Sequence, residues 1–177
     1  ALEDMALMRT LPNMRVLVPA DALETFEVVE KIANIYGPFY VRLTRPKVPV
    51  LPEHEFKFGK ASIMRDGEDA TIISTGILVS KALEAARQLA EESISTRVLN
   101  VHMVKPLDGN AIVKAAKDTG RIVTAEDHSI IGGLGSAVAE ELGERCPVVM
   151  RRVGARDRIG VSGPAEELLE KFGMSTR

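Results

Sequence analysis

The stretch ATIISTGILVSKALEAA, residues 70–86, decides the fold class. Its first part, Ala70–Gly76, is short, rich in β-branched residues and almost continuously apolar, which is typical of a strand covered on both faces. The helix predicted after it, Leu78–Glu92, places four apolar side chains on one face: Leu78, Ala82, Ala85 and Leu89. A buried strand that leads directly into an amphipathic helix is the repeating unit of α/β proteins with parallel sheets.

The same alternation of strands and helices continues to the C-terminus. One further strand is predicted before residue 70. Further β-branched runs predict strands, and amphipathic segments bounded by Gly, Pro or Asp predict helices. The predicted strands are Lys60–Gly67 with its turn, Thr96–Val104, Arg121–Asp127 and Pro147–Gly154, and the predicted helices are Asp108–Gly120, Gly135–Arg145 and Gly163–Gly173. This order predicts an α/β protein with helices on both faces of one sheet, a three-layer α/β/α architecture.

The first 45 residues show the pattern on a smaller scale. A helix over Leu2–Leu11 is followed by two short strands, Arg15–Pro19 and Phe39–Thr44, which flank a second helix. That helix begins at the D-x-x-E capping signal of Asp21 and Glu24 and is expected to end near Tyr36. A strand–helix–strand order places the two strands parallel in one sheet. The residues expected on the apolar face of the helix are Phe26, Val29, Ala33 and Tyr36.

Three prolines mark a change of composition after Arg45, at positions 46, 49 and 52. Such a stretch is stiff, extended and poor in hydrogen bonds, as expected of a linker. We therefore divide the chain into an N-terminal part (1–45), a linker (46–55) and a C-terminal domain (56–177). Two strands alone lack sheet neighbours, so the N-terminal part is expected either to oligomerise or to pack against the C-terminal domain. The residues expected to expose strand edges and apolar surface are Val16, Leu17 and Val41.

The composition excludes several classes of protein. The chain has 177 residues, with 23 Lys and Arg against 25 Asp and Glu, and 45% of its residues are hydrophobic. This is the balance of a globular domain rather than of a disordered chain. The net charge of −2 and the 4% aromatic content argue against nucleic-acid binding, and no apolar run reaches the length of a membrane span. A single cysteine, Cys146, allows no internal disulfide. The start of the sequence lacks signal-peptide features, so the expected compartment is the cytoplasm.

Three features are candidates for a functional site. Arg45 lies at the end of a predicted parallel strand, where its guanidinium suits either a phosphate or carboxylate, or an ion pair across the domain junction. The turn Gly132–Gly135 leads into a helix and could hold an anion, but it lacks both the dinucleotide-binding and the P-loop pattern, which favours a tight packing turn. His128, after Glu126 and Asp127, is either an acid–base group or, as we favour, a partly exposed loop or interface residue.

Six segments match one known family in their order and spacing. They are ALEDMALMRTLPNMRVLVPAD, VRLTRP, DATIISTGILVSKALEAA, VLNVHMVKPLD, EDHSIIGGLGSAVAE and RIGVSGPAEELLEKFG. Together they resemble the C-terminal part of transketolase, over essentially the whole chain. The EDHSIIGGLGSAVAE segment is most similar to the short, split type, in which two polypeptides share the enzyme. The equivalent parts of 1-deoxy-D-xylulose-5-phosphate synthase and of the 2-oxoacid dehydrogenase E1 β subunit are the close alternatives.

The resemblance implies domains, an activity and one site residue. Residues 1–45 would be the last βαβ portion of the pyrimidine-binding domain, and residues 56–177 would be the transketolase C-terminal domain. The assembled enzyme would transfer a two-carbon ketol unit between phosphorylated sugars, as in the pentose phosphate pathway, with thiamine diphosphate and Mg²⁺. Thr44-Arg45 matches the family's Ser/Thr-Arg pair, which implies that Arg45 contacts the substrate phosphate. Pro46 stands where relatives have Gln or Gly.

The catalytic and cofactor-binding groups of the family match no residue of this sequence. The resemblance therefore implies a C-terminal portion or fragment that is inactive by itself and binds no cofactor or metal by itself. Its expected partners are N-terminal cofactor-binding domains or a separate N-terminal subunit, and a second copy in a homodimer. No nucleic acid or membrane is expected as a partner. A non-catalytic module that recognises a phosphorylated ligand through Arg45 or the Gly132–Gly135 turn is the second hypothesis.

Overall fold

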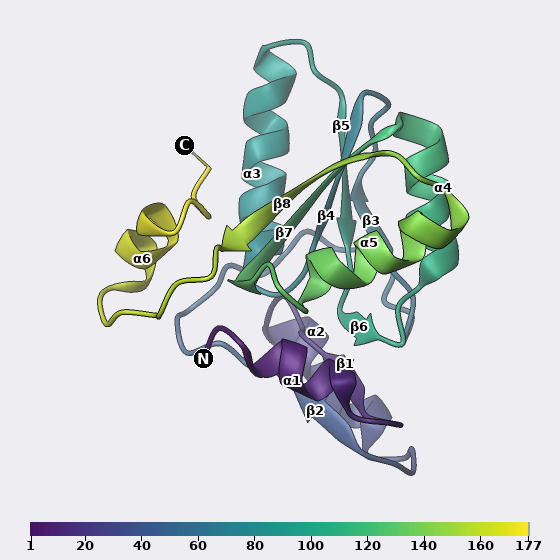
Figure 1. The fold of residues 1–177 in the computed structure, drawn as a ribbon, viewed down its shortest axis with the longest axis vertical. Coiled ribbons are helices and arrows are strands. Elements are labelled where there is room, and N and C mark those ends of the chain that lie inside the picture. Colours follow the sequence, from purple (N-terminus) through teal and green to yellow (C-terminus); the bar gives the residue numbers. More distant parts are fainter. Residues whose placement is uncertain (177) are drawn as a thin grey trace.

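The structure, a computed structural model, describes residues 1–176 and contains two sheets (Figure 1). The strands are β1 (Arg15–Leu17), β2 (Phe39–Val41), β3 (Ser62–Arg65), β4 (Ala70–Ser74), β5 (Thr96–Asn100), β6 (Met103–Lys105), β7 (Arg121–Ser129) and β8 (Val149–Ala155). The helices are α1 (Asp4–Thr10), α2 (Ala22–Ile32), α3 (Leu78–Glu91), α4 (Gly109–Thr119), α5 (Leu134–Arg145) and α6 (Ala165–Lys171). Most predicted elements are therefore present, with boundaries shifted by a few residues.

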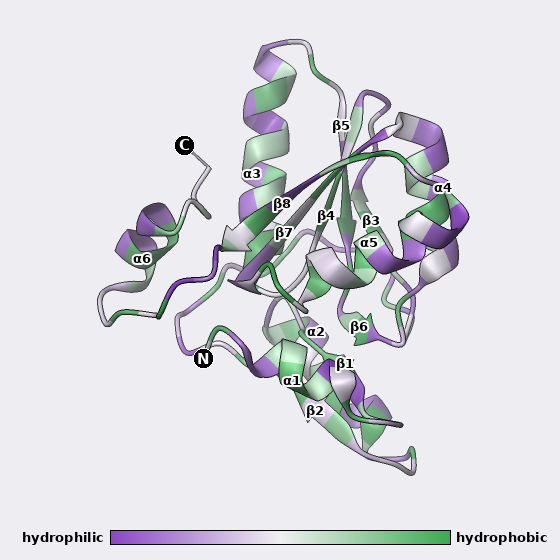
Figure 2. Ribbon diagram, viewed as in Figure 1, coloured by the Kyte–Doolittle hydropathy of each residue, from purple (hydrophilic) through white to green (hydrophobic). Residues whose placement is uncertain are grey.

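The larger sheet has the strand order β3-β5-β4-β7-β8. Its strands β5, β4, β7 and β8 run parallel, and β3 pairs antiparallel with β5 at one edge. Helices α3 and α6 contribute to the apolar cluster on one face, and α4 and α5 contribute to the cluster on the other face. Hydrophobic residues follow the central strands, and the helices alternate between hydrophobic and hydrophilic residues (Figure 2). The predicted three-layer α/β/α architecture is confirmed.

The smaller sheet has the order β2-β1-β6. Strands β1 and β2 are parallel, as the strand–helix–strand order predicted. The prediction of one continuous strand over Thr96–Val104 was wrong, because the chain leaves the larger sheet after Asn100 and β6 then pairs antiparallel with β1. His102 lies at this break, where its carbonyl accepts a hydrogen bond from the Val18 N–H at 2.7 Å. One segment of the C-terminal region thus completes the sheet of the N-terminal region.

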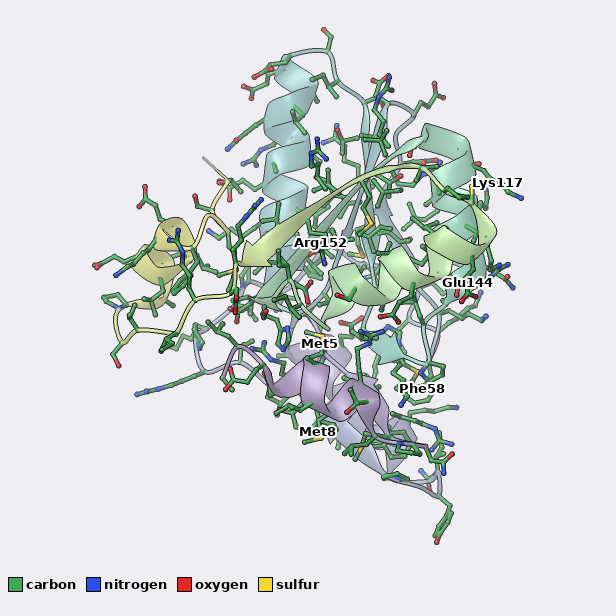
Figure 3. The ribbon with its side chains drawn as sticks, in the orientation of Figure 1. Met5, Met8, Phe58, Lys117, Glu144 and Arg152 are labelled. Atoms are coloured by element: carbon green, nitrogen blue, oxygen red, sulfur yellow. The ribbon has the colours of Figure 1, made fainter. Side chains whose placement is uncertain are left out.

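The N-terminal part packs against the C-terminal domain. Val16 and Leu17 are fully buried, so the prediction that they expose strand edges was wrong, and Val41 is half-buried. Strand β6 covers one edge of β1, and Met5 on α1 joins the core cluster that α4 and α5 build (Figure 3). The proline-rich segment is also tied down, because the Leu51 N–H donates to the Asp21 carboxylate at 2.8 Å.

Helix α2 turns a different face to the sheet than its hydrophobic pattern predicted. The inward face carries Glu24, Val28 and Ile32, at a four-residue spacing that keeps them on one side of the helix. Phe26 is 68% exposed and Tyr36, beyond the end of the helix, is fully exposed. The expected capping signal is present, since the Asp21 carboxylate accepts from the Glu24 N–H at 2.8 Å. A buried glutamate thus replaces the predicted apolar residues at the interface.

Within residues 1–176, no helix combines the length and the apolar character that a membrane crossing requires. The longest helix, α3, has 14 residues. A bilayer crossing needs roughly 20 predominantly apolar residues.

Candidate functional site

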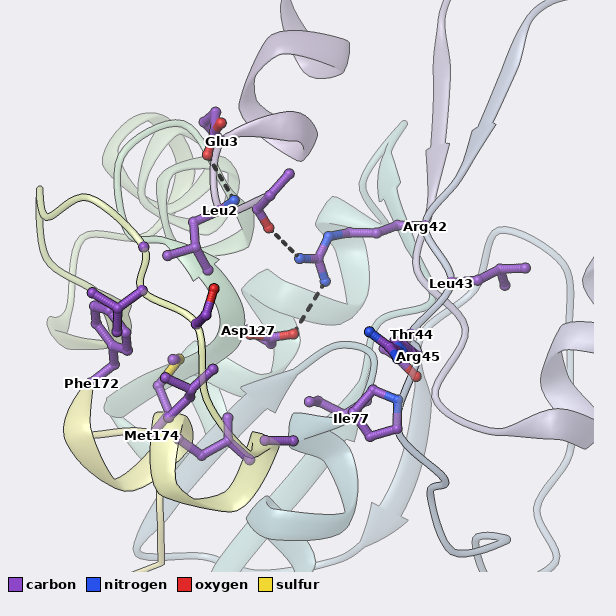
Figure 4. Close-up of a pocket in the computed structure, with 18 residues that line it drawn as sticks. Leu2, Glu3, Arg42, Leu43, Thr44, Arg45, Ile77, Asp127, Phe172 and Met174 are labelled. Atoms are coloured by element: carbon purple, nitrogen blue, oxygen red, sulfur yellow. Dashed lines mark hydrogen bonds and ion pairs between the residues drawn. The ribbon is translucent and has the colours of Figure 1, made fainter.

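A cavity of about 610 Å³ opens where the carboxyl end of β2 meets the first residues of the chain, the end of β7 and helix α6 (Figure 4). This is the edge at which parallel α/β sheets place their ligand sites. Its polar lining consists of Glu3, Arg42, Thr44, Arg45, Asp127 and Ser162. Its apolar lining includes Ile77, Leu168, Leu169, Phe172 and Met174.

Arg42 lies at the inner end of the cavity and is fully committed to protein partners. Its guanidinium is 3.1 Å from the Asp4 carboxylate and 3.6 Å from the Asp127 carboxylate, and it donates to the Ala1 carbonyl at 3.1 Å. Burial raises the pKa of Asp127 despite the charge of Arg42. Burial also opposes ionisation of Asp4, but the Tyr40 hydroxyl and Arg42 outweigh it and lower the pKa of Asp4. Arg42, which follows β2, therefore connects this strand to the start of the chain through Ala1 and Asp4 and to β7 through Asp127.

Arg45, three residues further on, has a different environment. It lines the cavity, is exposed, and makes no hydrogen bond or ion pair within residues 1–176. The ion pair across the domain junction that we considered for Arg45 is made by Arg42 instead. The guanidinium of Arg45 is thus available to an anionic ligand, and its contact with a substrate phosphate stays a prediction.

In the glycine-rich turn Gly132–Gly135, the amides of Gly132, Leu134 and Gly135 already have acceptors within the protein. The Leu134 and Gly135 N–H groups donate to the two carboxylate oxygens of Glu126 at 2.6 and 2.8 Å. Glu126 is fully buried, and burial raises its pKa to about 7 although both amides favour the ionised form. A side chain at Gly133 would collide with this carboxylate. This geometry agrees with the tight packing turn that we favoured, because Glu126 accepts from two amides at the start of α5 that an external anion would otherwise use.

His128 is also buried, so its assignment as a partly exposed loop residue was wrong. It lies within β7 and accepts a hydrogen bond from the Met5 N–H at 3.1 Å. It is absent from the lining of the cavity. The acid–base alternative therefore has no geometric support in residues 1–176.

A buried polar cluster between the two sheets was not predicted from the sequence. The Glu24 carboxylate accepts from the Ala20 N–H at 2.6 Å and from the Asn100 side chain at 2.9 Å, and lies 3.4 Å from Nδ1 of His102. Burial raises the pKa of Glu24 to about 7 and lowers the pKa of His102 to about 4. The capping signal that includes Glu24 was identified from the sequence, but only the fold shows how deeply this side chain is buried.

No grouping of three or more His, Cys, Asp or Glu side chains suited to a metal ion occurs in the part of the chain that the structure describes. The buried carboxylates are occupied by backbone amides, by Asn100 or by Arg42. The residues present therefore do not fit an Mg²⁺ site.

The fold and the cavity define a class: an α/β protein in which a small mixed sheet packs against a larger one, and an arginine without a partner among residues 1–176 lines the cavity. Family models identify that class more closely. The model of the transketolase C-terminal domain matches residues 59–177, and the model of the transketolase pyrimidine-binding domain matches residues 1–50. The chain belongs to the transketolase family.

Individual relatives agree with this assignment. The chain is 49% identical over 179 residues to the 6-deoxy-6-sulfo-D-fructose transketolase subunit SqwH of Clostridium sp. (strain MSTE9), covering 100% of this chain and 56% of that protein. It is 42% identical over 177 residues to an apulose-4-phosphate transketolase subunit of Phocaeicola vulgatus, covering 98% of this chain and 56% of that protein. The chain thus spans about half the length of these curated relatives.

Solved structures give the same result. A structure titled as a split gene transketolase in an inactive beta4 tetramer superimposes with a TM-score of 0.95 at 48% identity, covering 99% of this chain and 58% of that one. The transketolase of Campylobacter jejuni superimposes with a TM-score of 0.78 at 22% identity, covering 99% of this chain and 26% of that one. The second similarity extends the shared fold to a distant transketolase.

Proposed function

We propose that this chain is the C-terminal portion of a split-type transketolase, whose assembled enzyme transfers a two-carbon ketol unit between anionic sugars. The observation that carries the proposal is the similarity to split-transketolase subunits along the whole chain, at 49% identity to one of them. The chain's own contribution is an anion contact from Arg45 and structural support of the neighbouring domains.

The named relatives suggest what the anion is. One acts, by its name, on a sulfonated fructose and the other on apulose 4-phosphate. A sulfonate and a phosphate share a negatively charged terminal group with oxygen acceptors, and a guanidinium fork binds both. We therefore assign to Arg45 the terminal anion of the sugar, without a choice between the two groups.

The cofactor site is assigned to residues outside this chain. Transketolases use thiamine diphosphate, which supplies the chemistry of ketol transfer, together with Mg²⁺. Residues 1–176 offer no metal-binding cluster, so we assign the cofactor site to N-terminal domains or to a separate N-terminal subunit. The chain alone is then inactive, and homodimerisation accompanies assembly.

The test is an activity assay of the chain alone and of the chain completed with the N-terminal sections of a split transketolase. Both samples receive thiamine diphosphate, Mg²⁺ and a sulfonated or phosphorylated ketose donor with an aldose phosphate acceptor. Ketol transfer only in the completed sample supports the proposal. Transfer by the chain alone, or none in a completed sample that assembles, contradicts it.

A matched pair of variants tests the role of Arg45. Arg45→Gln in the completed enzyme is expected to raise KM for the anionic sugar by at least tenfold, because one charge-assisted contact is lost. Arg156→Gln removes the same charge from an exposed residue outside the cavity and is expected to leave KM unchanged. Equal effects of the two variants would contradict a specific contact. Tight binding of a phosphorylated ligand to the chain alone, without activity on completion, would favour the binding-module hypothesis.

A further inference from the structure

Helix α1 has no N-terminal cap from its own sequence. Glu3 occupies the N-cap position without a side-chain hydrogen bond to the helix. The cap comes instead from His128, more than 120 residues away, whose Nε2 accepts from the Met5 N–H at 3.1 Å and the Ala6 N–H at 3.4 Å. The free amides of a helix N-terminus need an acceptor when they are buried, and His128 provides it.

These contacts define the protonation state of His128. Backbone N–H groups can only donate, so Nε2 carries a lone pair. Nδ1 lies 2.8 Å from the Ser129 carbonyl oxygen, which can only accept, so Nδ1 carries the proton. The imidazole is therefore neutral in the docked structure. A protonated His128 would point a second N–H at the amides of Met5 and Ala6 and would lose the cap.

The docking of α1 builds one wall of the cavity. Ala1, Leu2 and Glu3 line the cavity, immediately before the helix that His128 caps. The Leu2 carbonyl also accepts from the Ser129 N–H at 2.7 Å. At the other end of α1, Arg9 donates to the carbonyls of Gly132 and Gly133 at 2.6 and 3.2 Å.

We propose that His128 is a positioning residue: its neutral imidazole caps α1 and thereby holds residues 1–3 as a wall of the anion-binding cavity. The ligand class is a sugar with a phosphate or sulfonate group, so this part of the inference rests on the proposed role of Arg45. The cap itself depends only on the contacts of His128 and does not require the proposed function.

The charged groups around His128 determine how it titrates. Asp4 on α1 lies 3.8 Å from Nε2, Glu126 on β7 lies 3.7 Å from Nδ1, and Arg42 and Asp127 lie close enough to interact with it electrostatically. Burial, followed by Arg42, lowers the pKa of His128, whereas hydrogen bonding to the backbone of Ser129 and of Glu3 and the charge of Asp4 raise it. Burial is the largest of these effects, so the imidazole is neutral at pH 7.5, and the cap is lost only when acidification reaches the lowered pKa of His128.

The first test measures amide exchange of residues 1–10 in the full chain. The acidic pH for the test is the one at which NMR shows the His128 imidazole to be protonated. In the wild type, exchange at Met5 and Ala6, corrected for intrinsic rates, is expected to be at least tenfold faster at that acidic pH than at pH 7.5. His128→Gln retains an acceptor that does not titrate and is expected to remove this pH effect, whereas His128→Leu is expected to give fast exchange at both pH values. Amides of β4 and β5 report whether each variant is folded, and His54→Gln is the control for loss of another imidazole. Unchanged exchange in a folded His128→Leu, or a pH effect that persists in His128→Gln, would overturn the cap.

The second test measures binding of sulfate, whose charge does not change over this pH range. Acidification adds positive charge to the cavity region, so electrostatics alone would strengthen sulfate binding. The positioning role predicts the opposite: affinity falls at least threefold from pH 7.5 to the acidic pH at which His128 is protonated in the wild type, and not in His128→Gln. Stronger binding at that acidic pH in the wild type would overturn the positioning role. If sulfate does not bind, or if Arg45→Gln binds it equally well, the proposed anion site fails, while the exchange result still decides the cap.

Discussion

Two fully buried glutamates, Glu24 and Glu126, support different parts of this molecule. Glu126 lies in β7 and accepts from the Leu134 and Gly135 amides, so it caps α5 within one domain. Glu24 lies on α2 and accepts from Ala20 and from the side chain of Asn100 in β5. Burial raises the pKa of both to about 7. The two side chains are equally buried and have similar pKa values, but their hydrogen-bond donors differ in how freely they can rotate.

The difference is that backbone amides cannot turn, whereas an asparagine side chain can. Both donors to Glu126 are peptide N–H groups held by a helix, so only a group with two acceptors fits. Glu24 has one rotatable donor, and the second polar atom of that donor, Oδ1 of Asn100, has no hydrogen-bond partner within the described residues. Glu126 is thus a rigid helix cap, and Glu24 is an adjustable connection between the two sheets.

The largest expected effect is the loss of the rigid cap. Glu126→Gln turns an amide NH₂ toward a fixed N–H group, and the free energy of unfolding at pH 8 is expected to fall by about 4 kcal/mol. Urea unfolding followed by circular dichroism measures it. The matched control is Glu144→Gln, an exposed residue on the same helix, which is expected to change stability by less than about 0.5 kcal/mol. A loss below about 1 kcal/mol for Glu126→Gln would contradict the cap.

The second expected effect is a pH dependence of stability at the Glu24 site, which includes a histidine, whereas the Glu126 cap is made by backbone amides. The pKa of His102, beside Glu24, is lowered to about 4 by burial, so the folded state does not bind a proton that the unfolded state accepts below about pH 6.5. This residue therefore costs stability as the pH falls from 6.5 to 4, by on the order of 3 kcal/mol. The raised pKa of Glu24 acts in the opposite direction, because the folded state accepts a proton below about pH 7.

The measurement is the difference in unfolding free energy between wild type and His102→Gln, taken from pH 7.5 to pH 4. The variant is expected to gain relative to the wild type as the pH falls. A difference that stays constant across this range would show that His102 titrates normally in the fold.

A third, smaller effect tests whether the Glu24 connection adjusts. Glu24→Gln at pH 8 is expected to cost only about 1 kcal/mol, because Asn100 can rotate and accept from the new amide. Asn100→Asp alone places two carboxylates together and is expected to cost more. The double variant is expected to recover most of that loss, since the new amide at position 24 then donates to the new carboxylate at position 100. A double-mutant cycle without coupling would contradict a direct contact.

The smallest effect is expected on the outer face of α2. Phe26→Ser is expected to change the free energy of unfolding of this chain by less than about 0.5 kcal/mol, because the ring is 68% exposed. Val28→Ser on the buried face is the contrasting variant and is expected to cost about 3 kcal/mol. Similar losses for both would mean that α2 packs in the orientation that its hydrophobic pattern predicted.

Much of the fold follows from local sequence. Continuous apolar runs such as Ala70–Ser74 and capping signals such as Asp21 and Asp108 placed most strands and helices correctly, because both depend on residues a few positions apart. The family was identified separately, by the resemblance of six segments to transketolase in their order and spacing. Of the candidate site residues, Arg45 was selected because it follows a predicted strand; it lines the cavity, and its contact with a substrate stays a prediction.

The remaining features depend on contacts between distant parts of the chain. The sequence by itself determined the alternation of strands and helices, the α/β class and the family. Only the tertiary structure decided that α2 buries Glu24 rather than Phe26, that β6 pairs with β1, and that His128 caps α1. The physical reason is that burial of a polar side chain depends on whether distant groups supply its hydrogen bonds, and hydrophobic periodicity carries no information about those groups.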